Sequence, residues 1–406
     1  MRKIFYGWWV VFACFFIYFY ISSTVFSFTA FFKPISKEFG WSYTQISIAA
    51  SIRSLEQGIF APIMGFLVDR FGARKLIFCG TLFIGIGFIM ASQINSLIMF
   101  YGAFVVIALG MSACVGTVLT AAVANWFKKD LSKALGIISA GIGAGGLFVP
   151  IIISLINYYQ WRTTFTIIGF GMLLFGIPLS LLVRHSPEQY GYLPDGITPE
   201  KQAASPDDHD REVNIKEALK NRVFWHLSFA EAIRRMTTIA IITHVMPYLN
   251  NVGMSRSRAA LVTASIPVFS IIGRLVFGWF GDIYNKSHAM ALVYFITGVS
   301  LLAFAYAQTT WLIIPFLIFF PLSWGAQPLK GAIIREYFGR RSLGSIIGLM
   351  AGIGSIATII GPSLAGWTYD TFGNYRMIWL FFAATFSIAV ILMLTIKPLQ
   401  KFAKMG

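Results

Sequence analysis

Residues 65–75 read GFLVDRFGARK and lie between two long apolar stretches. Gly65 has no side chain and allows two helices to approach closely, and Gly72 allows a tight turn. Asp69 can accept hydrogen bonds from a helix N-terminus or pair with an arginine. The stretch therefore predicts a short loop between two packed helices, with a carboxylate able to lock one arrangement of them.

The same features recur in the second half of the chain. Three short motifs of the first half recur in the second half at nearly the same offset, between 211 and 214 residues. Gly65 and Asp69 correspond to Gly278 and Asp282. Trp126-Phe127 corresponds to Tyr337-Phe338, and Trp161-Arg162 to Tyr375-Arg376. The second loop, GWFGDIYNK at 278–286, lacks the arginine cluster of the first. A nearly constant offset at separate places indicates an internal duplication, and parallel repeats are a common architecture of transporters.

Apolar stretches long enough to cross a membrane fill most of the chain. Of 406 residues, 57% are hydrophobic and only 12% are charged, about half the share found in soluble domains. A stretch of about 20 residues spans a ~30 Å hydrocarbon core as a helix, which satisfies its own backbone hydrogen bonds. Twelve spans are predicted: 7–32, 44–68, 76–94, 97–125, 134–157, 163–183, 223–249, 258–281, 289–308, 311–336, 343–369 and 377–396.

The basic residues predict the orientation of these spans. With the N-terminus in the cytoplasm, inside segments hold 20 Lys and Arg and outside loops hold 6. This bias is the one that the positive-inside rule expects, so the net charge of +16 does not indicate a nucleic-acid partner. The first apolar run reaches Phe32, longer than the apolar core of a signal peptide, and is expected to remain as a span. We expect a multi-pass protein of the cell (plasma) inner membrane with both termini in the cytoplasm.

One polar segment interrupts the pattern. Residues 185–221 are rich in Pro, Asp and Glu and are expected to form a cytoplasmic linker with a short amphipathic helix at 214–221. The linker divides the chain into an N-terminal six-helix bundle, residues 1–184, and a C-terminal six-helix bundle, residues 222–406.

The 65–75 stretch resembles the loop signature of the major facilitator superfamily: Gly, three residues, Asp-Arg, one residue, Gly, one residue, Arg. The resemblance implies an all-α membrane protein of twelve transmembrane helices in two pseudo-symmetric six-helix bundles. It also implies a gate at the cytoplasmic face, formed by Gly65, Asp69, Arg70, Gly72, Arg74, Gly278 and Asp282. The alternative is a positively charged turn without a gating role.

Residues 126–141, WFKKDLSKALGIISAG, resemble the loop-and-helix motif of the monocarboxylate transporter family. The matching positions are Trp126, Phe127, Lys129, Ala134, Gly136, Ala140 and Gly141. Gly7-Trp8 matches a second signature of that family but lacks its preceding acidic residue. The linker sequence SPEQYGYLPDG is similar to linkers of bacterial relatives near the oxalate:formate antiporters. These resemblances imply a carrier of small carboxylates.

Several ionisable residues fall inside the predicted spans, where each costs roughly 2.5–3.5 kcal/mol and marks a functional candidate. They are Arg53, Glu56, Glu231, Arg234, Arg235, His244, Arg274, Lys330, Arg335 and Glu336. The third, sixth, ninth and twelfth spans have none, and the resemblance implies that these four are the peripheral, lipid-facing spans. The pattern predicts a central cavity with surplus positive charge, which suits an anionic substrate.

Four cations are the candidates for substrate binding: Arg274, Arg53, Arg235 and Lys330. The resemblance implies that Arg274 corresponds to an arginine in the eighth span of monocarboxylate and oxalate-type transporters. In those transporters this arginine is expected to bind the substrate carboxylate. Alternatively, Arg274 is a structural partner of a helix end near the 278–286 loop. Residues 343–369 hold no Lys or Arg, whereas an oxalate-type carrier is expected to have a cation there, and this argues against a dicarboxylate.

Three residues are the candidates for proton coupling: Glu56, Glu231 and His244. Glu56 lies three residues after Arg53, and Glu231 lies four before Arg235, so each pair shares a helix face. The carboxylates either neutralise the arginines or take up protons and free them for substrate. Histidine side chains in general change charge near neutral pH, which makes His244 a candidate for proton coupling, but it also suits a capping role.

Three functions remain open from the sequence. The first is a secondary transporter of small organic anions by alternating access, with a carboxylate substrate, the lipid bilayer, and protons or a counter-anion as partners. The second is a drug/proton antiporter of the same fold, which would favour carboxylates in the cavity. The third is a non-transporting membrane sensor, which would need a signalling domain larger than the linker. No enzyme signature, metal-ligand cluster or cofactor motif occurs, so we expect no enzyme, metal site or cofactor.

Overall fold

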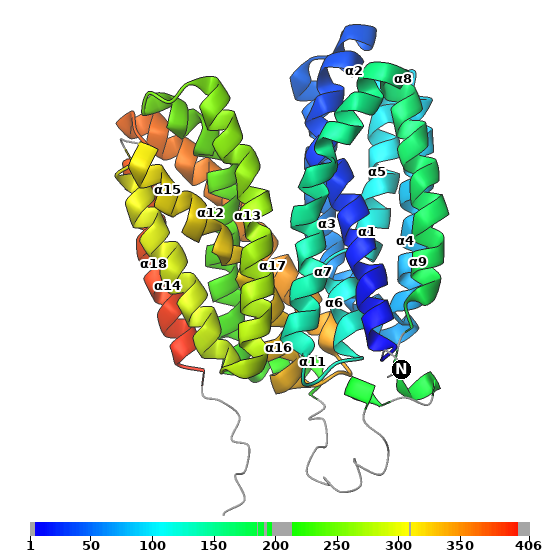
Figure 1. The fold of residues 1–406 in the computed structure, drawn as a ribbon, viewed down its shortest axis with the longest axis vertical. Helices are drawn as coiled ribbons and strands as arrows, with labels where there is room; N and C mark the ends of the chain where they lie inside the picture. The colour runs from blue at the N-terminus through cyan, green and yellow to red at the C-terminus, as the bar shows by residue number, and fades with distance from the viewer. Residues whose placement is uncertain (1–4, 185, 191–192, 197–212, 308–309, 397–406) are drawn as a thin grey trace, which may run out of the picture.

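The computed structural model describes residues 5–184, 186–190, 193–196, 213–307 and 310–396. Within these ranges, the side chains of a few helical residues, including Arg53 and Glu56, lie outside the described part. The described residues form helices and connecting turns (Figure 1).

The first half of the chain forms one bundle (Figure 1). Its elements are α1 (Gly7–Ser27), η1 (Phe28–Phe31), α2 (Phe32–Phe39), α3 (Tyr43–Phe71), α4 (Ala73–Ser92), α5 (Leu97–Cys114), α6 (Thr117–Ala124), α7 (Leu131–Gly145), η2 (Gly146–Phe148), α8 (Val149–Gly171), η3 (Met172–Gly176) and α9 (Ile177–Leu182).

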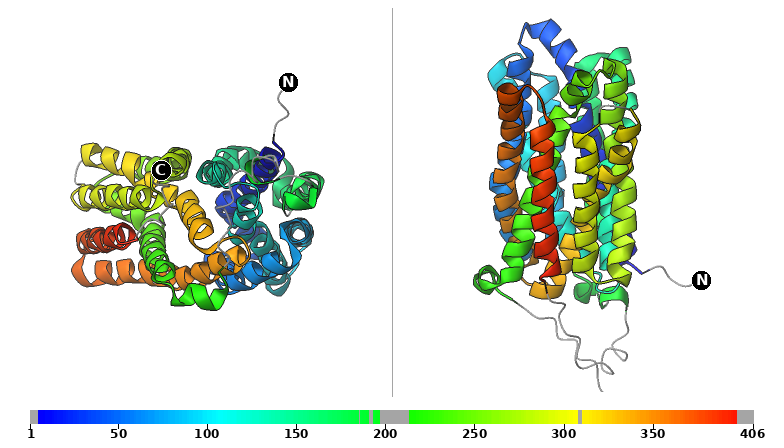
Figure 2. Two further views of the ribbon diagram at one scale, coloured as in Figure 1. Left: turned by 90° about the horizontal axis from the view of Figure 1, so that it is seen from below. Right: turned by 90° about the vertical axis from the view of Figure 1, so that its left-hand side faces the viewer.

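The second half forms another bundle, and the two lie side by side when viewed along the helices (Figure 2). Short segments η4 (Glu188–Tyr190) and η5 (Pro194–Gly196) and helix α11 (Ile215–Lys220) precede it. Its elements are α12 (Arg222–Asn251), α13 (Arg256–Ile283), α14 (Lys286–Ala305), α15 (Thr310–Phe319), η6 (Phe320–Gly325), α16 (Ala326–Phe338), α17 (Leu343–Phe372) and α18 (Arg376–Leu394). The face that carries α11 and residues 186–196 is called the linker face below, and the opposite face, which carries α2, the far face.

Each predicted span coincides with a helical pass, so the predicted twelve-helix fold is confirmed. By length and apolar composition alone, eight helical segments of the described residues can cross a membrane. The segment Leu131–Leu182 holds two passes, because Gln160 leaves the helical conformation with φ of 65° and turns the chain. The second, seventh and tenth passes fall outside these eight, and part of the second pass lies outside the described residues.

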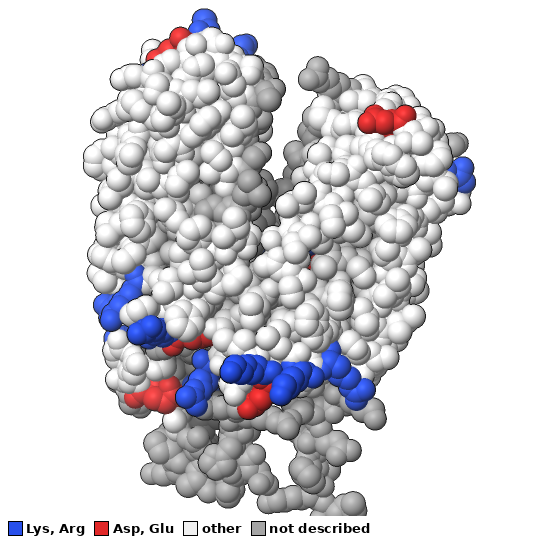
Figure 3. Space-filling view, turned by 180° about the vertical axis from the view of Figure 1, so that it is seen from behind, with Lys and Arg blue, Asp and Glu red and all other residues white. Residues whose placement is uncertain are grey.

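The outer surface of both bundles is apolar. Exposed large side chains lie on the third, sixth, ninth and twelfth spans, and examples are Phe83, Leu174, Phe295 and Ile391. Figure 3 shows a broad surface without charge between the two faces, with Lys and Arg gathered at the linker face. A surface of this kind is solvated by lipid rather than by water.

Two passes are broken where the sequence predicts continuous spans. In the fourth, α5 ends at Cys114 and α6 begins at Thr117, with Gly116 between them at φ of 55°. Glycine tolerates this conformation because it lacks a Cβ atom. In the tenth, the 3-10 segment η6 separates α15 from α16. Irregular backbone at membrane depth is tolerated where protein or a cavity surrounds it.

The two bundles meet at the linker face and separate toward the far face (Figure 1). Two helix pairs form this contact, α3 with α17 and α7 with α13. Their backbones touch directly: a Cβ atom at Gly65 would collide with the carbonyl oxygen of Gly344, and one at Gly136 would collide with that of Arg274. Glycine therefore sets the helix spacing at this face.

Candidate functional site

A cavity of about 280 Å³ lies between the two bundles and takes its walls from both. The first bundle contributes Tyr18, Ala61, Ser112, Val115, Gly116, Thr117, Thr120, Leu135, Ser139 and Ile142. The second contributes Arg235, Gln327, Lys330, Gly331, Ile347 and Ala351. Figure 3 shows a deep notch between the bundles on the far face, so the molecule is open on that side and closed at the linker face.

A buried charge cluster forms the second-bundle wall of the cavity. The Glu231 carboxylate is fully buried and accepts hydrogen bonds from three cations. Arg234 Nε lies 2.8 Å from Oε2, while Arg235 Nε and Lys330 Nζ lie 2.9 and 3.0 Å from Oε1. Arg235 and Lys330 also line the cavity. One carboxylate thus faces three positive charges, and the cluster keeps a surplus of two.

The structure brings two substrate-binding candidates, Arg235 and Lys330, together with the proton-coupling candidate Glu231. Sequence reasoning paired Glu231 with Arg235 only and gave Arg234 no role in binding. Arg234 is also buried and forms two hydrogen bonds to Glu231. Arg53 and Glu56 also belong to the predicted site, but their side chains lie outside the described residues.

Arg274 lies at the contact between the bundles. Its side chain is 1% exposed, and its Nη1 donates a hydrogen bond to the backbone carbonyl of Ser139 on α7. Its Nε has no hydrogen-bond partner among the described residues. Arg274 is not among the described residues that line the cavity, so the structure does not bring it together with Arg235 and Lys330.

His244 lies apart from the cavity, among α12, α17 and α18. Its Nε2 lies 3.1 Å from the carbonyl oxygen of Pro362, so Nε2 must carry a proton to donate to this acceptor. Its Nδ1 lies 3.2 Å from the hydroxyl oxygen of Tyr375, which suits either protonation state of the ring. The structure therefore does not bring His244 into the charge cluster.

Both loop carboxylates bind the N-terminus of a helix in the other bundle. Asp69 accepts from the N–H groups of Gly344 and Ser345, at 2.9 and 2.8 Å, at the start of α17. Asp282 accepts from the N–H groups of Ser132 and Lys133, at 2.8 and 2.7 Å, at the start of α7. A carboxylate is favoured there by the helix dipole and the unpaired N–H groups. These two contacts are called the latches below.

The other predicted gate residues lie around the two latches. Gly72 turns the chain between α3 and α4 at φ of 84°. The Arg70 guanidinium lies 5.4 Å from the centre of the Phe71 ring, and Arg74 lies in the first turn of α4. Gly278 packs against the Ser132 carbonyl across the second latch.

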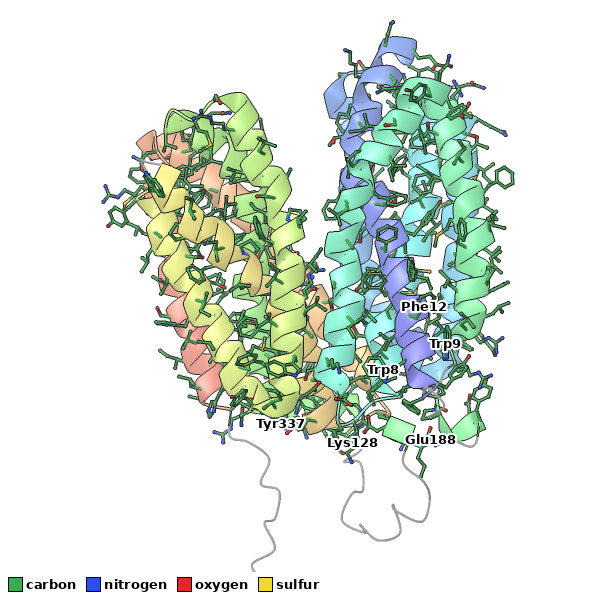
Figure 4. All side chains as sticks on the ribbon, viewed as in Figure 1. Trp8, Trp9, Phe12, Lys128, Glu188 and Tyr337 are labelled. Carbon is green, nitrogen blue, oxygen red and sulfur yellow. The ribbon has the colours of Figure 1, made fainter. Side chains whose placement is uncertain are left out.

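The aromatic signature residues Trp126 and Phe127 lie at the linker face rather than in the cavity. Phe127 packs edge-on against Trp8, with ring centres 4.9 Å apart, and Trp126 packs against Phe5 and Tyr6. Figure 4 shows Trp8 and Lys128 at this end of the first bundle. The two sequence signatures of the resemblance therefore meet in one aromatic cluster.

The start of the linker binds both bundles at this face. The Asp195 carboxylate accepts from the N–H groups of Lys128 and Lys129 at 2.9–3.1 Å. Glu188 forms an ion pair of 2.6 Å with Arg340 of the second bundle, and Figure 4 places it at the lower end of the molecule. A helix, α11, is found where the amphipathic segment is predicted. Residues 197–212 of the predicted linker lie outside the described residues.

The remaining polar lining is neutral, and sequence reasoning missed it. Tyr18, Thr117, Ser139 and Gln327 face the same space as the cations. Single hydroxyl and amide groups are common in apolar helices, so they give no signal in one sequence. In the described part of the chain, no three His, Cys, Asp or Glu side chains gather into a group that could hold a metal ion.

Comparison with known proteins agrees with this architecture. The chain matches the family model of the Major Facilitator Superfamily over residues 11–329 and 235–404. It is 25% identical to monocarboxylate transporter 12 of Mus musculus, over 94% of this chain and 84% of that protein.

Solved structures show the same fold. The proton:xylose symporter XylE has a TM-score of 0.77 and 13% identity, with 97% of this chain and 96% of that one covered. FucP in the outward conformation has a TM-score of 0.75 and 16% identity, with 96% of this chain and 99% of that one covered.

Proposed function

Since the chain belongs to the major facilitator superfamily, we propose that it carries small organic anions of the monocarboxylate type across the membrane by alternating access. Transport requires a site between the two bundles that opens to one face at a time. The cavity shared by both bundles supplies such a site in this proposal.

The charge around the cavity is the observation that carries the proposal. Among the described residues of the cluster, Arg234, Arg235 and Lys330 face one carboxylate, Glu231. Arg274 lies at the contact between the bundles, and its Nε has no hydrogen-bond partner among the described residues. A carboxylate substrate would neutralise part of this surplus, whereas a cationic drug would add to it. The similarity to monocarboxylate transporter 12 supports the same class of substrate.

The latches give the proposed cycle its direction. In the state described, both latches hold the linker face closed while the far face is notched (Figure 3). We propose that substrate enters from the far face and that release at the linker face requires the Asp69 and Asp282 contacts to separate. Residues 1–184 and 222–406 act as the two moving bodies and residues 185–221 as their linker.

The bias in basic residues supports a proposed location. With Lys and Arg concentrated at the linker face, this face is the cytoplasmic one in an inner membrane, and both termini lie on that side. Substrate then enters from outside the cell. The driving force is a proton gradient or the exchange of a second anion.

Uptake into reconstituted liposomes tests the proposal. The substrates are lactate, pyruvate, oxalate, formate and cationic dyes, each with and without a pH gradient, and liposomes without protein are the control. We expect monocarboxylate uptake. Stimulation by an inward proton gradient indicates symport, and a requirement for internal anion indicates exchange. Movement of dyes without movement of any carboxylate contradicts the proposal.

A further inference from the structure

The break in the fourth pass places a helix N-terminus at the wall of the cavity. Val115, Gly116 and Thr117, which span the break, all line it. Helix α6 starts at Thr117 and runs for eight residues toward the linker face. The first N–H groups of a helix lack intrahelical partners, and the helix dipole makes this end favourable for negative charge. Broken helices use such ends to bind anionic groups in other transporters.

Three hydroxyl groups surround this helix end. The Gly116 N–H donates to the Tyr18 hydroxyl oxygen at 2.6 Å, and the Tyr18 hydroxyl donates to no described group. Thr117 and Ser139 are 5% and 8% exposed and line the cavity, yet neither hydroxyl forms a hydrogen bond with any described group. Hydroxyl groups that face a cavity without a protein partner can donate to a bound anion.

The opposite wall carries the positive charge. Arg235 and Lys330 come from α12 and α16 of the second bundle, and α16 follows the break in the tenth pass. At the offset of 211 that relates the halves near this point, Gly116 corresponds to Gln327, which also lines the cavity. The two related breaks therefore frame one cavity, with neutral donors on one side and cations on the other.

We propose that the N-terminus of α6, with the hydroxyls of Tyr18, Thr117 and Ser139, forms a neutral oxyanion subsite in the first bundle. One carboxylate oxygen of the substrate binds there, while the other faces Arg235 and Lys330. The carboxylate then joins the two bundles, and the first bundle recognises charge without carrying any described charge at this wall. This inference rests on the proposed function and assigns specificity-determining residues to it.

Binding of lactate to purified full-length protein tests the subsite. Thr117→Val removes the hydroxyl and keeps the shape of the side chain. Thr117→Ser restores the hydroxyl, and Thr120→Val is the matched control, because Thr120 lines the same cavity one turn along α6. Each hydrogen bond to a charged group that is lost weakens binding by roughly tenfold. We expect this loss for Thr117→Val and Tyr18→Phe, and near-normal affinity for Thr117→Ser and Thr120→Val.

A neutral analogue separates anion recognition from a change in cavity shape. Affinity for lactamide, which lacks the carboxylate charge, should be the same in Thr117→Val and in the wild type. Equal lactate affinity in Thr117→Val and Thr120→Val overturns the subsite, as does equal weakening of lactate and lactamide binding. Failure of the wild type to bind any carboxylate overturns the proposed function itself, whatever the variants do.

Discussion

At the scale of single residues, Glu231 has the largest number of charged partners in the described site. Its carboxylate pairs with Arg234, Arg235 and Lys330 inside a bundle otherwise filled with apolar side chains. Attraction between buried charges offsets the cost of removing them from water only while each has its partner. Glu231 therefore holds the cations in place as well as limiting their surplus.

Glu231→Gln should destabilise the protein, because it leaves the buried cations Arg234 and Lys330 and the partly buried Arg235 without a counter-charge. Breaking a buried pair costs about 3–5 kcal/mol. We expect a clearly lower Tm in detergent than for the wild type. Glu336→Gln, which breaks an ion pair of 2.8 Å with Lys286 at a half-exposed site, should change the Tm little. Equal Tm values for the two variants would show that Glu231 is not the structural counter-ion.

Arg274→Ala should abolish anion transport and leave the fold intact. The substitution removes a buried guanidinium whose Nε has no described partner, so folding loses little hydrogen bonding while anion binding loses a charge. Uptake in liposomes and the elution profile of the purified protein measure the two effects. Arg376→Ala, which removes a cation stacked on Tyr306 at the far face, is the control. Undiminished uptake in Arg274→Ala would remove this residue from the site.

Glu38 lies outside the membrane spans, and its ion pair should make the stability of the protein depend on pH. It lies on α2, where it accepts from Arg162 and from Trp161 Nε1 at 2.7 Å. Partial desolvation opposes its ionisation, but these hydrogen bonds hold the pKa of the Glu38 carboxyl below its usual value. Its contribution to stability is thus present above the usual pKa and is lost as pH falls through the lowered pKa.

The corresponding measurement compares Tm against pH for the wild type and Glu38→Gln. Below pH about 4.3, the ordinary pKa of Glu, the advantage of the wild type over the variant should shrink. A constant difference across this range would contradict the assignment of the ion pair.

The sequence predicts the charged residues around the cavity and the pairing of Glu231 with Arg235, but not their other partners. A charge in an apolar span is conspicuous because it is costly, so Arg235, Arg274, Lys330 and Glu231 can be identified from the pattern alone. Which carboxylate meets which cation depends on helix packing between residues about 100 positions apart, as for Lys330 and Glu231. Neutral groups such as Thr117 cannot be singled out at all.

At the scale of the elements, the two latches should control how often the linker face opens. Asp69→Asn and Asp282→Asn each remove a charge at a helix N-terminus, worth about 0.3–2 kcal/mol. We expect the double variant to populate the state open at the linker face. Labelling of Ser132→Cys, which is buried at the start of α7, should rise in that background.

The control for the latches is Asp370→Asn, an exposed carboxylate near the far end of α17. It should leave the labelling of Ser132→Cys unchanged. Equal labelling in the double variant and in the control would contradict a latching role for the two aspartates.

The elements also show where periodic patterns stop being informative. Span length and position follow from apolar runs, since only helices satisfy their backbones in lipid. The breaks at Gly116 and in η6 cannot be predicted from apolar runs, because the residues around them are as apolar as the helices they interrupt. One glycine among 37 gives no warning that it adopts positive φ.

At the scale of the whole molecule, the open face can be tested by chemical access. Ala351→Cys lines the cavity and should react with a membrane-impermeant maleimide added to intact cells. Cys14 and Cys114 are buried and should not react, and Cys79, exposed on α4, is replaced by serine beforehand. Labelling of Ala351→Cys only in inverted vesicles would reverse the proposed orientation.

The internal duplication makes the overall architecture predictable. Matching loops at offsets of 211 to 214 indicate two similar halves, and the family resemblance implies that the third, sixth, ninth and twelfth spans face lipid. The duplication does not predict which face of the molecule is closed, because the same spans are present whichever face is closed. The contacts between the bundles determine it, among them those of Asp69 and Asp282 with the opposite bundle.

The notch on the far face also affects how the protein responds to the membrane potential. Water that enters it extends the outer solution toward the middle of the bilayer, so most of the voltage falls across the closed layer at the linker face. A unit charge that crosses 100 mV changes energy by about 2.3 kcal/mol. In the proposed cycle, the surplus charge around Glu231 would move relative to this field when the bundles rock. We therefore expect the return of the empty carrier to be electrogenic, with a rate that depends on voltage.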